Sequence, residues 1–515
     1  MNRQRITLGE LLTRQAIQHP DRDFAAFLDD DVSLTYGQFN RQVNQFAHAL
    51  ASTGVSKGEH VIVLLRTSPE CLVVSYALKK LGAIEVAINA DFRGPGLERT
   101  IRLTQAALLV TSNEFAGPLS EVPSAMEFVQ SILVIGDEKL ALAGVDVDEI
   151  RFGSILPQRF DEPDVQSADT DPCAVLFTSG TTGQSKGVVM SHRFAMRVAE
   201  GLVDALEITE SDCFYTPLPL YHYGAAYHDV LGAMLAGARI ALRKRFSLSK
   251  YWSDVRAAKT TIATCHGSDT TLLWNAAPSP DDRNHSMRVM WGGYTVDRQQ
   301  FEKRFGVRCP NAYGLSDAGN PAIQRLSEVS SDTCAGKVFD DLYDVRIADE
   351  FDDSVASGEV GEILLRPKEP DVMPSGYFGM PEYTLEAWRN MWLHTGDIGK
   401  LDEHGYLYFL GRRKDVIRHR GENILPSEVE EVLNAHDCVQ ESVVFGIAGE
   451  LGDQDVAAVV MRYPGVSVCE QALRDYCKNK MASWMIPTVW KVVDEIPKTA
   501  TGKPVRKDLL ALLES

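Results

Sequence analysis

The sequence lacks paired cysteines, long apolar runs and an excess of positive charge. Its nine cysteines are scattered without a Cys-x-x-Cys pair, so we expect reduced thiols rather than a disulfide framework or a zinc site. No apolar run reaches the roughly 18 residues of a membrane-spanning helix. Lys and Arg number 52 against 71 Asp and Glu, a net charge of −19, which argues against a nucleic-acid-binding face. A locally positive pocket for a small anion remains compatible with this charge.

The remaining composition is that of a globular protein with a sizeable core. The chain has 515 residues, of which 44% are hydrophobic and 24% charged, enough for roughly three structural units. Its first residues, MNRQRITLGELL, contain no long apolar segment and are not typical of a signal peptide. A cytoplasmic protein without a membrane span is therefore expected.

A strand–helix–strand unit stands out between residues 60 and 89. HVIVLL reads as a buried strand, the following 15 residues from Ser68 as a helix, and AIEVAIN as the next strand. Ser68 is placed to cap the helix, Pro69 suits its first position and Gly82 its end. Such units predict a parallel sheet covered by helices.

Short apolar runs recur to about residue 291, and the pattern then changes twice. From Lys337, short strands broken by Gly and acidic turns predict an antiparallel segment. After Arg412, a helix capped by Ser427, two strands and a further helix predict a small α+β domain. The predicted fold class is α/β, with a large region of parallel-sheet layers and a β-rich segment at 1–411 and a small domain at 412–515.

The segment LFTSGTTGQSKG, residues 176–187, is the strongest chemical signal. An apolar strand leads into a loop of Gly, Ser and Thr that ends at Lys186. Glycines let backbone N–H groups converge on an anion, hydroxyls add donors, and the lysine adds a point charge. The loop lacks the GxxxxGK[ST] register of a Walker A motif. A phosphate-binding loop is favoured over the alternative, a polar linker.

Four further motifs accompany this loop. They are YGLSD at 313–317, LHTGD at 393–397, GRRKD at 411–415 and PKTATGK at 497–503. In this order and spacing the five motifs resemble the adenylate-forming superfamily of acyl-CoA synthetases, adenylation domains and luciferases, over essentially the whole chain. The resemblance implies that a carboxylate attacks the α-phosphate of ATP and that a thiol then displaces AMP from the acyl adenylate. It implies ATP, Mg²⁺ and coenzyme A as partners of a carboxylic acid substrate.

The resemblance assigns the ATP site residue by residue. The loop would cover the β- and γ-phosphates, Tyr313 would pack on adenine, and Asp397 would accept from the ribose hydroxyls, with Arg412 as a second contact. Ser316 and Asp317 would lie near the phosphates, with Asp317 at the metal. The implied ATP-binding residues are Thr178, Ser179, Gly180, Thr181, Thr182, Gly183, Lys186, Tyr313, Gly314, Ser316, Asp317, Asp397, Arg412 and Lys503.

Two motifs depart from the usual pattern of the family. Ser316 and Asp317 replace its usual Thr-Glu pair, and the shorter Asp favours reaching the metal through water; the alternative is that Asp317 caps a turn. Arg420, followed by Gly421, replaces the first Gly of its usual Gly-Gly where the thiol approaches. Arg420 would contact CoA phosphates or obstruct pantetheine, and the alternative, a solvated charge, is slightly favoured.

The resemblance also implies a conformational change between the two half-reactions. Lys503 matches a mobile lysine that bridges the substrate carboxylate and the α-phosphate, and so is a candidate catalytic residue. Lys414 matches the hinge about which the C-terminal domain rotates, carrying Lys503 away before the thiol enters. The alternative for Lys414 is an ordinary exposed linker residue.

The acyl pocket is implied around His222, which matches a residue near the carboxylate or the thiol entrance and is the second candidate catalytic residue. The alternative for His222, a structural histidine, is slightly favoured. Aromatic and small residues together favour a short or cyclic acid over a long chain. Packing of Trp291 and Tyr294 against the sheet is an equally good alternative. The implied pocket residues are His222, Tyr223, Trp291, Gly292, Gly293, Tyr294, Ala318, Gly319 and Asn320.

We therefore predict an ATP- and Mg²⁺-dependent carboxylic acid–CoA ligase. Amino-acid adenylation is less favoured, because the stretch that would hold an Asp for an amino group carries His222 and Tyr223. The alternatives left open are an acyl-AMP ligase that loads a separate carrier protein, a luciferase-like oxidative side activity and a non-catalytic nucleotide-binding relative. The identity of the acid and the choice between monomer and homodimer are also left open.

Overall fold

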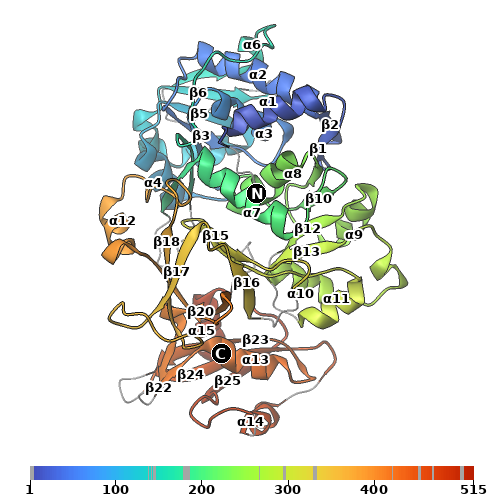
Figure 1. The fold of residues 1–515 in the computed structure, drawn as a ribbon, viewed down its shortest axis with the longest axis vertical. Helices are drawn as coiled ribbons and strands as arrows, with labels where there is room; N and C mark the ends of the chain where they lie inside the picture. Colours follow the sequence, from blue (N-terminus) through green and yellow to red (C-terminus); the bar gives the residue numbers. More distant parts are fainter. Residues whose placement is uncertain are drawn as a thin grey trace.

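The computed structural model of the chain describes residues 5–136, 139–140, 142, 147–177, 186–265, 267–293, 297–328, 333–419, 422–449, 454–466, 469–478, 480–498 and 504–514. Layers of helix and sheet form the large part of the molecule, and a small domain lies at one end (Figure 1). Among these residues, no helix combines the length and apolar character needed to cross a bilayer. All nine cysteines are free thiols, as the sequence predicts.

The first sheet contains the predicted strand–helix–strand unit. Strand β3 (His60–Leu64) and β4 (Ile84–Ala87) pair in parallel around helix α3 (Pro69–Lys80). The Ser68 hydroxyl accepts the Cys71 N–H at 3.1 Å and Pro69 is the first helical residue, which confirms the predicted helix start. The order of this sheet within the described residues is β7 (Asp148–Arg151), β6 (Ser131–Ile135), β5 (Leu108–Ser112), β3, β4, β8 (Pro172–Phe177) and β9 (Gly187–Ser191). Only the β8–β9 pair of these is antiparallel.

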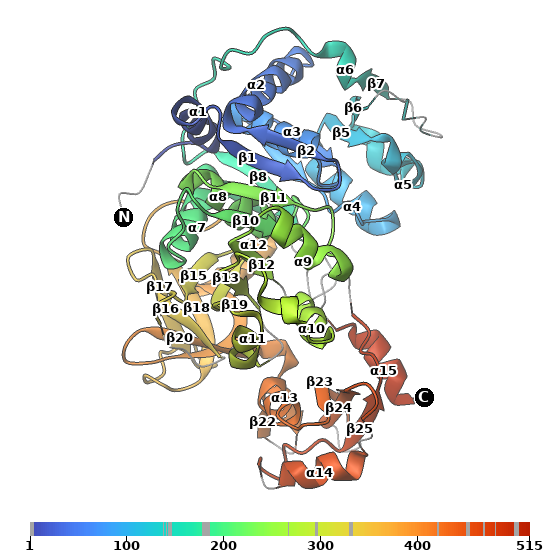
Figure 2. The same cartoon turned by 90° about the vertical axis from the view of Figure 1, so that its right-hand side faces the viewer.

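The second sheet is also mainly parallel, and the largest apolar core joins the two sheets. Its order within the described residues is β13 (Val289–Gly292), β12 (Ile262–Cys265), β10 (Cys213–Thr216), β11 (Arg239–Leu242), β1 (Asp23–Phe27) and β2 (Val32–Thr35). The core draws on both sheets and on helices α1 (Leu8–Gln18), α2 (Tyr36–Ser52), α3, α7 (His192–Ala205) and α8 (Leu231–Ala236), which lie together in Figure 2. Burying apolar faces of sheets and helices against each other is what stabilises such layers.

A third sheet is antiparallel throughout its described strands, as the sequence predicts. Its order is β14 (Ala312–Leu315), β15 (Gly319–Ile323), β16 (Cys334–Val338), β20 (Tyr406–Arg412), β19 (Leu393–Leu401), β18 (Gly361–Pro367) and β17 (Tyr343–Ala348). The predicted change of texture near Lys337 is too late, because antiparallel pairing already begins at Ala312. Strands β14 and β15 are too short, and separated by too tight a turn, to show a clear alternation.

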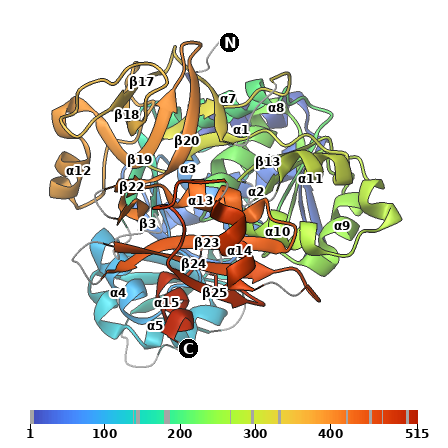
Figure 3. The same cartoon turned by 90° about the horizontal axis from the view of Figure 1, so that it is seen from below.

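The small domain follows residue 412. It contains the pair β21 (Ile417–His419) and β22 (Glu422–Ile424), the sheet β23 (Val439–Ala448), β24 (Gln454–Arg462) and β25 (Val489–Val493), and helices α13 (Pro426–Asn434), α14 (Glu470–Lys478) and α15 (Arg506–Glu514). Figure 3 shows this domain lying across one end of the larger part. The α/β fold with a small α+β domain is thereby confirmed.

The predicted cap at Ser427 is wrong. Helix α13 begins at Pro426, its N-cap is Leu425, and no side chain caps it. Proline is well suited to the first helical position, so the helix starts earlier and Ser427 lies inside its first turn. The Ser427 hydroxyl donates instead to the carbonyl of Leu410 in β20. It therefore ties the small domain to the antiparallel sheet.

The other helical segments connect the sheets. They are α4 (Gly94–Thr104), η1 (Asn113–Phe115), α5 (Ala116–Ser120), η2 (Pro123–Phe128), α6 (Phe152–Ile155), the π-helix η3 (Gly224–Val230), α9 (Leu248–Ala257), α10 (Gly267–Asn275), η4 (Pro280–Arg283), α11 (Arg298–Phe305), α12 (Pro381–Ala387), η5 (Arg389–Met391) and η6 (Arg413–Asp415).

Candidate functional site

A cavity of about 2100 Å³ lies where all three large sheets meet the small domain. The predicted site residues that line it are Lys186, His222, Tyr223, Gly314, Ser316, Asp317, Arg412 and Lys414. Residues Glu495, Ile496 and Lys498 of the small domain also line it. Motifs that are more than 200 residues apart in sequence therefore meet around one space, as the sequence analysis expects of an active site.

Several predicted residues lie outside the described part of the chain. These are Thr178, Ser179, Gly180, Thr181, Thr182, Gly183, Tyr294, Arg420, Gly421 and Lys503. Their assigned roles stay predictions. Two of these segments have described neighbours that line the cavity. Phe177 and Lys186 flank residues 178–185 of the glycine-rich loop, and Lys498 belongs to the PKTATGK motif that contains Lys503.

Tyr313, Asp397 and Arg412 form one group at the antiparallel sheet, joined by a hydrogen bond and an ion pair. The Tyr313 hydroxyl donates to Asp397 Oδ2 at 2.7 Å, and Arg412 Nε lies 2.8 Å from Asp397 Oδ1. Pairing of β19 with β20 sets Asp397 opposite Arg412. Tyr313 is buried, and its ring packs against Phe409 with 5.8 Å between ring centres. The sequence motifs that contribute these residues are thus brought together by strand register.

The Asp397 carboxylate is held at an electrostatic cost. Its side chain is 1% exposed, and this burial raises the pKa of Asp397 to about 6, against the opposing effects of Arg412 and the Tyr313 hydroxyl. Arg412 forms an ion pair with Oδ1 without hydrogen-bond alignment, and among the described residues no donor satisfies this buried oxygen. A buried acceptor without a donor is the environment that a ligand hydroxyl would complete.

Lys186 and Asp317 lie on another side of the cavity, joined by aromatic residues that the sequence analysis did not identify. Lys186 Nζ is 4.6 Å from the ring centre of Tyr377 and 4.9 Å from that of Tyr383. The Tyr377 hydroxyl donates to Asp317 Oδ2 at 2.6 Å. Tyr377 is 60 residues from Asp317 in the sequence, and no local pattern relates the two.

Asp317 fits the requirements of a Mg²⁺ ion that arrives with ATP. Among the described residues no group of three or more His, Cys, Asp or Glu could hold a metal ion alone. Protein-bound Mg²⁺ in nucleotide sites usually takes one or two carboxylates and completes its octahedron with phosphates and water. Asp317 lines the cavity together with Lys186 and offers one such carboxylate.

A second carboxylate missed by the sequence analysis is Glu362 of β18. It lines the cavity, is buried, and accepts the Gly396 N–H at 3.1 Å. Arg413 Nη1 lies 2.9 Å from its carboxylate and His394 Nδ1 lies 3.3 Å from it. This cluster fixes the chain beside Asp397 on one side and beside the predicted hinge residue Lys414 on the other.

The acyl side of the cavity ends in aromatic and amide groups. Tyr223 lines the cavity, and its hydroxyl donates to Asn320 Oδ1 at 2.8 Å. His228 Nε2 is 2.7 Å from the same oxygen. The His228 ring packs edge-to-face on Tyr223 and on Trp291, with 4.8 Å between ring centres in both pairs. His228 of η3 is a further residue that the sequence analysis did not select.

The other predicted pocket residues shape the backbone behind this wall. Gly292 has φ of +129°, and a Cβ there would lie 2.2 Å from the Cys265 carbonyl oxygen. Gly319 has φ of +81°, and its Cβ would meet the Tyr343 hydroxyl at 2.6 Å. Ala318 is fully buried, whereas Gly293 is exposed. Trp291, 4% exposed, packs behind the cavity lining.

His222 lies at the cavity with a defined ring orientation. Its Nδ1 accepts the Gly224 N–H at 3.1 Å, so the neutral ring carries its proton on Nε2. The residue follows a tight turn in which its own N–H bonds to the Pro219 carbonyl at 2.9 Å. The start of η3 therefore sets the position that the sequence motif predicts for this histidine.

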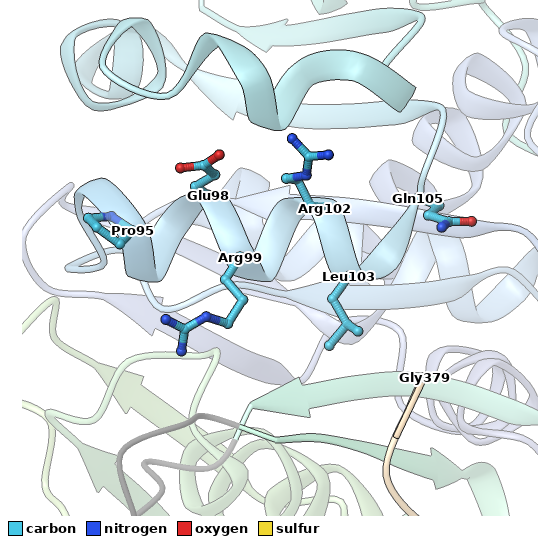
Figure 4. Close-up of a pocket in the computed structure, with 7 residues that line it drawn as sticks. All are labelled: Pro95, Glu98, Arg99, Arg102, Leu103, Gln105 and Gly379. Carbon is cyan, nitrogen blue, oxygen red and sulfur yellow. The ribbon is translucent and has the colours of Figure 1, made fainter. Parts of the chain in front are cut away.

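A second, shallower cavity of about 630 Å³ runs along α4. Figure 4 shows Glu98 and Arg102 on one side of this helix and Arg99 and Leu103 on the other. Arg102 pairs with Glu127 at 3.2 Å, and the side chains are exposed. None of the predicted site residues lines this cavity, so we place the chemistry in the larger one.

Comparison with known proteins agrees with this geometry. Residues 12–378 match the family model of AMP-binding enzymes, and residues 428–503 match the C-terminal domain of AMP-binding enzymes. The crotonobetaine/carnitine–CoA ligase of Salmonella paratyphi B is 30% identical over 484 residues, which cover 92% of this chain and 93% of that protein. The chain belongs to the AMP-binding enzyme family.

Solved structures show the same fold over the full length. The anthranilate CoA ligase AuaEII, in complex with anthranoyl-AMP, is 25% identical with a TM-score of 0.88, covering 99% of this chain and 98% of that one. ATP-bound MatB from Rhodopseudomonas palustris is 22% identical with a TM-score of 0.85, covering 98% of both chains. The second likeness concerns the fold alone.

Family and relatives define the class of enzyme. This is an AMP-forming acid–thiol ligase of the CoA-ligase type. ATP converts a carboxylic acid to its acyl adenylate with release of pyrophosphate, and a thiol then takes the acyl group with release of AMP.

Proposed function

We propose that this enzyme joins a compact carboxylic acid with a polar distal group to coenzyme A, using ATP and Mg²⁺ in the cytoplasm. The observation that carries the proposal is the large cavity lined by Lys186, Asp317 and Tyr223. Arg412 also lines this cavity and pairs with the buried Asp397 at 2.8 Å. One space thus offers a place for the triphosphate, the nucleoside and an acid of limited length.

In the first half-reaction, an oxygen of the substrate carboxylate attacks the α-phosphorus and the bond to the β-phosphate oxygen breaks. Lys186 and the Thr178–Gly183 loop hold the leaving pyrophosphate, and Asp317 would hold a metal ion that would neutralise phosphate charge when bound. Tyr313 packs on adenine. Asp397 Oδ1, the buried oxygen without a donor, accepts a ribose hydroxyl, and Arg412 supports it as a second contact.

In the second half-reaction, a thiolate attacks the acyl carbonyl and AMP leaves with the mixed-anhydride oxygen. We assign Lys503 to the first step only and Lys414 to the hinge at the start of a mobile domain, residues 412–515. Burial and the neighbouring Arg412 and Arg506 lower the pKa of Lys414, against Asp415, and Lys414 lines the cavity between the two parts. These surroundings favour the hinge over an ordinary linker residue.

The choice of CoA as the thiol is supported by basic residues at the cavity. Arg66, Lys244 and Arg245 line it, in a chain whose net charge is −19. Lys244 also pairs with Asp30 at 2.6 Å. Positive side chains in an acidic protein favour a local anionic ligand, such as the phosphates of CoA. His222, and the Arg420–Gly421 segment, belong to the proposed path of the thiol.

The acid class is supported by the end wall. Tyr223, His228 and Trp291 are 8%, 6% and 4% exposed and pack ring against ring, so we expect no room for a long alkyl chain. Both hydrogen bonds to Asn320 Oδ1 orient its amide. Among the described residues the buried Trp291 Nε1–H has no acceptor. Trp291 lies behind the cavity lining, so an acid with a distal acceptor would complete this donor by extending past Tyr223.

The proposal is tested by pyrophosphate exchange into ATP with matched acids. Benzoate and its ring-nitrogen analogue form one pair; butyrate and methoxyacetate form another, and octanoate and hexadecanoate test length. We expect exchange with short acids, a preference for the acceptor-bearing member of each pair, and no exchange with hexadecanoate. Trp291→Phe should reduce that preference about fivefold or more, whereas Trp392→Phe, a buried tryptophan away from the cavity, should leave it intact.

The thiol acceptor is tested in the same assay mixture. Added CoA should give the acyl-CoA and AMP, whereas a product formed only with an acyl carrier protein would identify the carrier-loading alternative. ATP binding without exchange for any acid would favour the non-catalytic alternative. Preference for hexadecanoate would contradict the proposed acid class.

A further inference from the structure

Tyr377 is held by backbone pairing next to Lys186. Residues 375–378 run beside strand β9, which begins directly after Lys186: Ser375 N–H donates to the Val189 carbonyl at 3.2 Å and Phe378 N–H to the Gly187 carbonyl at 2.7 Å. A bridge pairs Val188 with Tyr377. The position of Tyr377 relative to Lys186 is therefore set by main-chain register rather than by side-chain contacts alone.

The ring of Tyr377 contacts the lysine. Lys186 Nζ lies over it at 4.6 Å and over Tyr383 of α12 at 4.9 Å, distances at which an ammonium group is attracted by an aromatic face. The segments that carry the two rings are linked, because the backbone N–H of Tyr377 donates to the hydroxyl of Thr384, the residue after Tyr383, at 2.9 Å. Together they orient a side chain that would otherwise sample many rotamers.

The hydroxyl of Tyr377 contacts the carboxylate. It donates to Asp317 Oδ2 at 2.6 Å. A charge-assisted hydrogen bond of this length fixes the orientation of the carboxylate.

We propose that Tyr377 is a positioning residue for the adenylation step, which sets the cationic Lys186 and the metal-facing carboxylate of Asp317 at a fixed spacing around the triphosphate. Its two ends act separately: the ring orients Lys186 and the hydroxyl orients Asp317. The inference rests on the proposed assignment of Lys186 and Asp317 to the phosphate side of the cavity. Tyr377 needs no contact with ATP for this role.

The separate ends define the experiment. ATP binding is measured by titration calorimetry on the full chain, once with EDTA and once with Mg²⁺, for wild type, Tyr377→Phe and Tyr377→Leu. The Phe variant keeps the ring and loses the hydroxyl. We expect unchanged metal-free ATP affinity, with the gain in affinity on adding Mg²⁺ reduced about tenfold. The Leu variant should in addition lose about three- to tenfold of metal-free affinity.

A matched control and a double variant separate positioning from general damage. Tyr408→Phe removes another tyrosine–aspartate hydrogen bond, from β20 to Asp402 at 3.2 Å. Neither residue lines the cavity, and this variant should bind ATP like wild type. In an Asp317→Asn background, Tyr377→Phe should cause no further loss of the Mg²⁺-dependent gain, because both changes act on one carboxylate. Thermal unfolding identifies any variant that fails to fold.

The outcomes distinguish the inference from the function on which it rests. If Mg²⁺ raises the ATP affinity of wild type and of Tyr377→Phe by the same factor, the proposed role of the hydroxyl is overturned. Equal metal-free affinity of the Leu and Phe variants overturns the role of the ring. Wild type whose ATP affinity does not respond to Mg²⁺ contradicts the proposed metal role of Asp317 itself.

Discussion

Replacing Asp397 with Asn should stabilise the protein while impairing it as an enzyme. The side chain is 1% exposed, and its pKa is raised by burial from an ordinary 3.8 to about 6. Two pKa units correspond to about 3 kcal/mol. At pH 8 the ionised carboxylate therefore costs the folded state about 3 kcal/mol, a cost that a neutral amide of the same shape does not carry.

The sign of the pH dependence follows from the raised pKa. Between pH 3.8 and 6 the folded state binds more protons at Asp397 than the unfolded state, so wild-type stability falls as pH rises through this window. Asn does not titrate. The advantage of Asp397→Asn should thus be about 2–3 kcal/mol at pH 8 and about half of that at pH 5.

Urea unfolding followed by tryptophan fluorescence at the two pH values measures this advantage. Asp402→Asn is the matched control with the opposite sign. Although partial burial opposes it, the backbone N–H groups of Tyr406 and His404 lower the pKa of Asp402, so its amide variant should be less stable than wild type at pH 8. The ATP affinity of Asp397→Asn should fall tenfold or more, because the neutral amide has one acceptor oxygen where the carboxylate has two charged ones. An Asp397→Asn variant that is less stable than wild type, or a gain in stability that is the same at both pH values, would contradict a raised pKa of Asp397 in the folded state.

Two further predictions concern the separate half-reactions. Lys503→Ala should reduce pyrophosphate exchange at least 100-fold, as expected for the loss of a charge that contacts the transition state, yet leave thioester formation from preformed acyl adenylate nearly intact; equal losses in both assays would contradict the domain rotation. Arg245→Glu should raise the KM for CoA about tenfold through charge reversal at the cavity without changing pyrophosphate exchange, whereas Arg256→Glu, on the exposed part of α9, should change neither. An unchanged KM for CoA in the Arg245 variant would place the thiol path elsewhere.

Local sequence patterns predicted the elements that local chemistry determines. Ser68 and Pro69 start α3 as expected because a cap and a first-turn proline act within four residues. The same reasoning gave a wrong cap at Ser427. Pro426 begins the helix one residue earlier, and the Ser427 hydroxyl donates to the Leu410 carbonyl in the antiparallel sheet. The motif spacing also brought Asp397 and Arg412 into register on adjacent strands.

Contacts between distant segments carried no sequence signal. Tyr377 reaches Asp317 across 60 residues, and Glu362 reaches Arg413 across 51. Neither residue stands in a pattern that marks chemistry, since each acts by orienting another side chain. His228 was missed for a related reason. Its place at the acyl wall depends on the π-helix η3, and a π-helical turn leaves no mark in hydrophobic periodicity.

We propose that one cavity activates a compact acid with ATP and transfers it to CoA. The decisive measurement is acid-dependent exchange of pyrophosphate into ATP, first without CoA and then after addition of CoA. We predict exchange with short or single-ring acids that carry an acceptor, then conversion to the acyl-CoA and AMP when CoA is added. No exchange with any acid while ATP still binds, or exchange that gives no acyl-CoA on addition of CoA, would contradict the account.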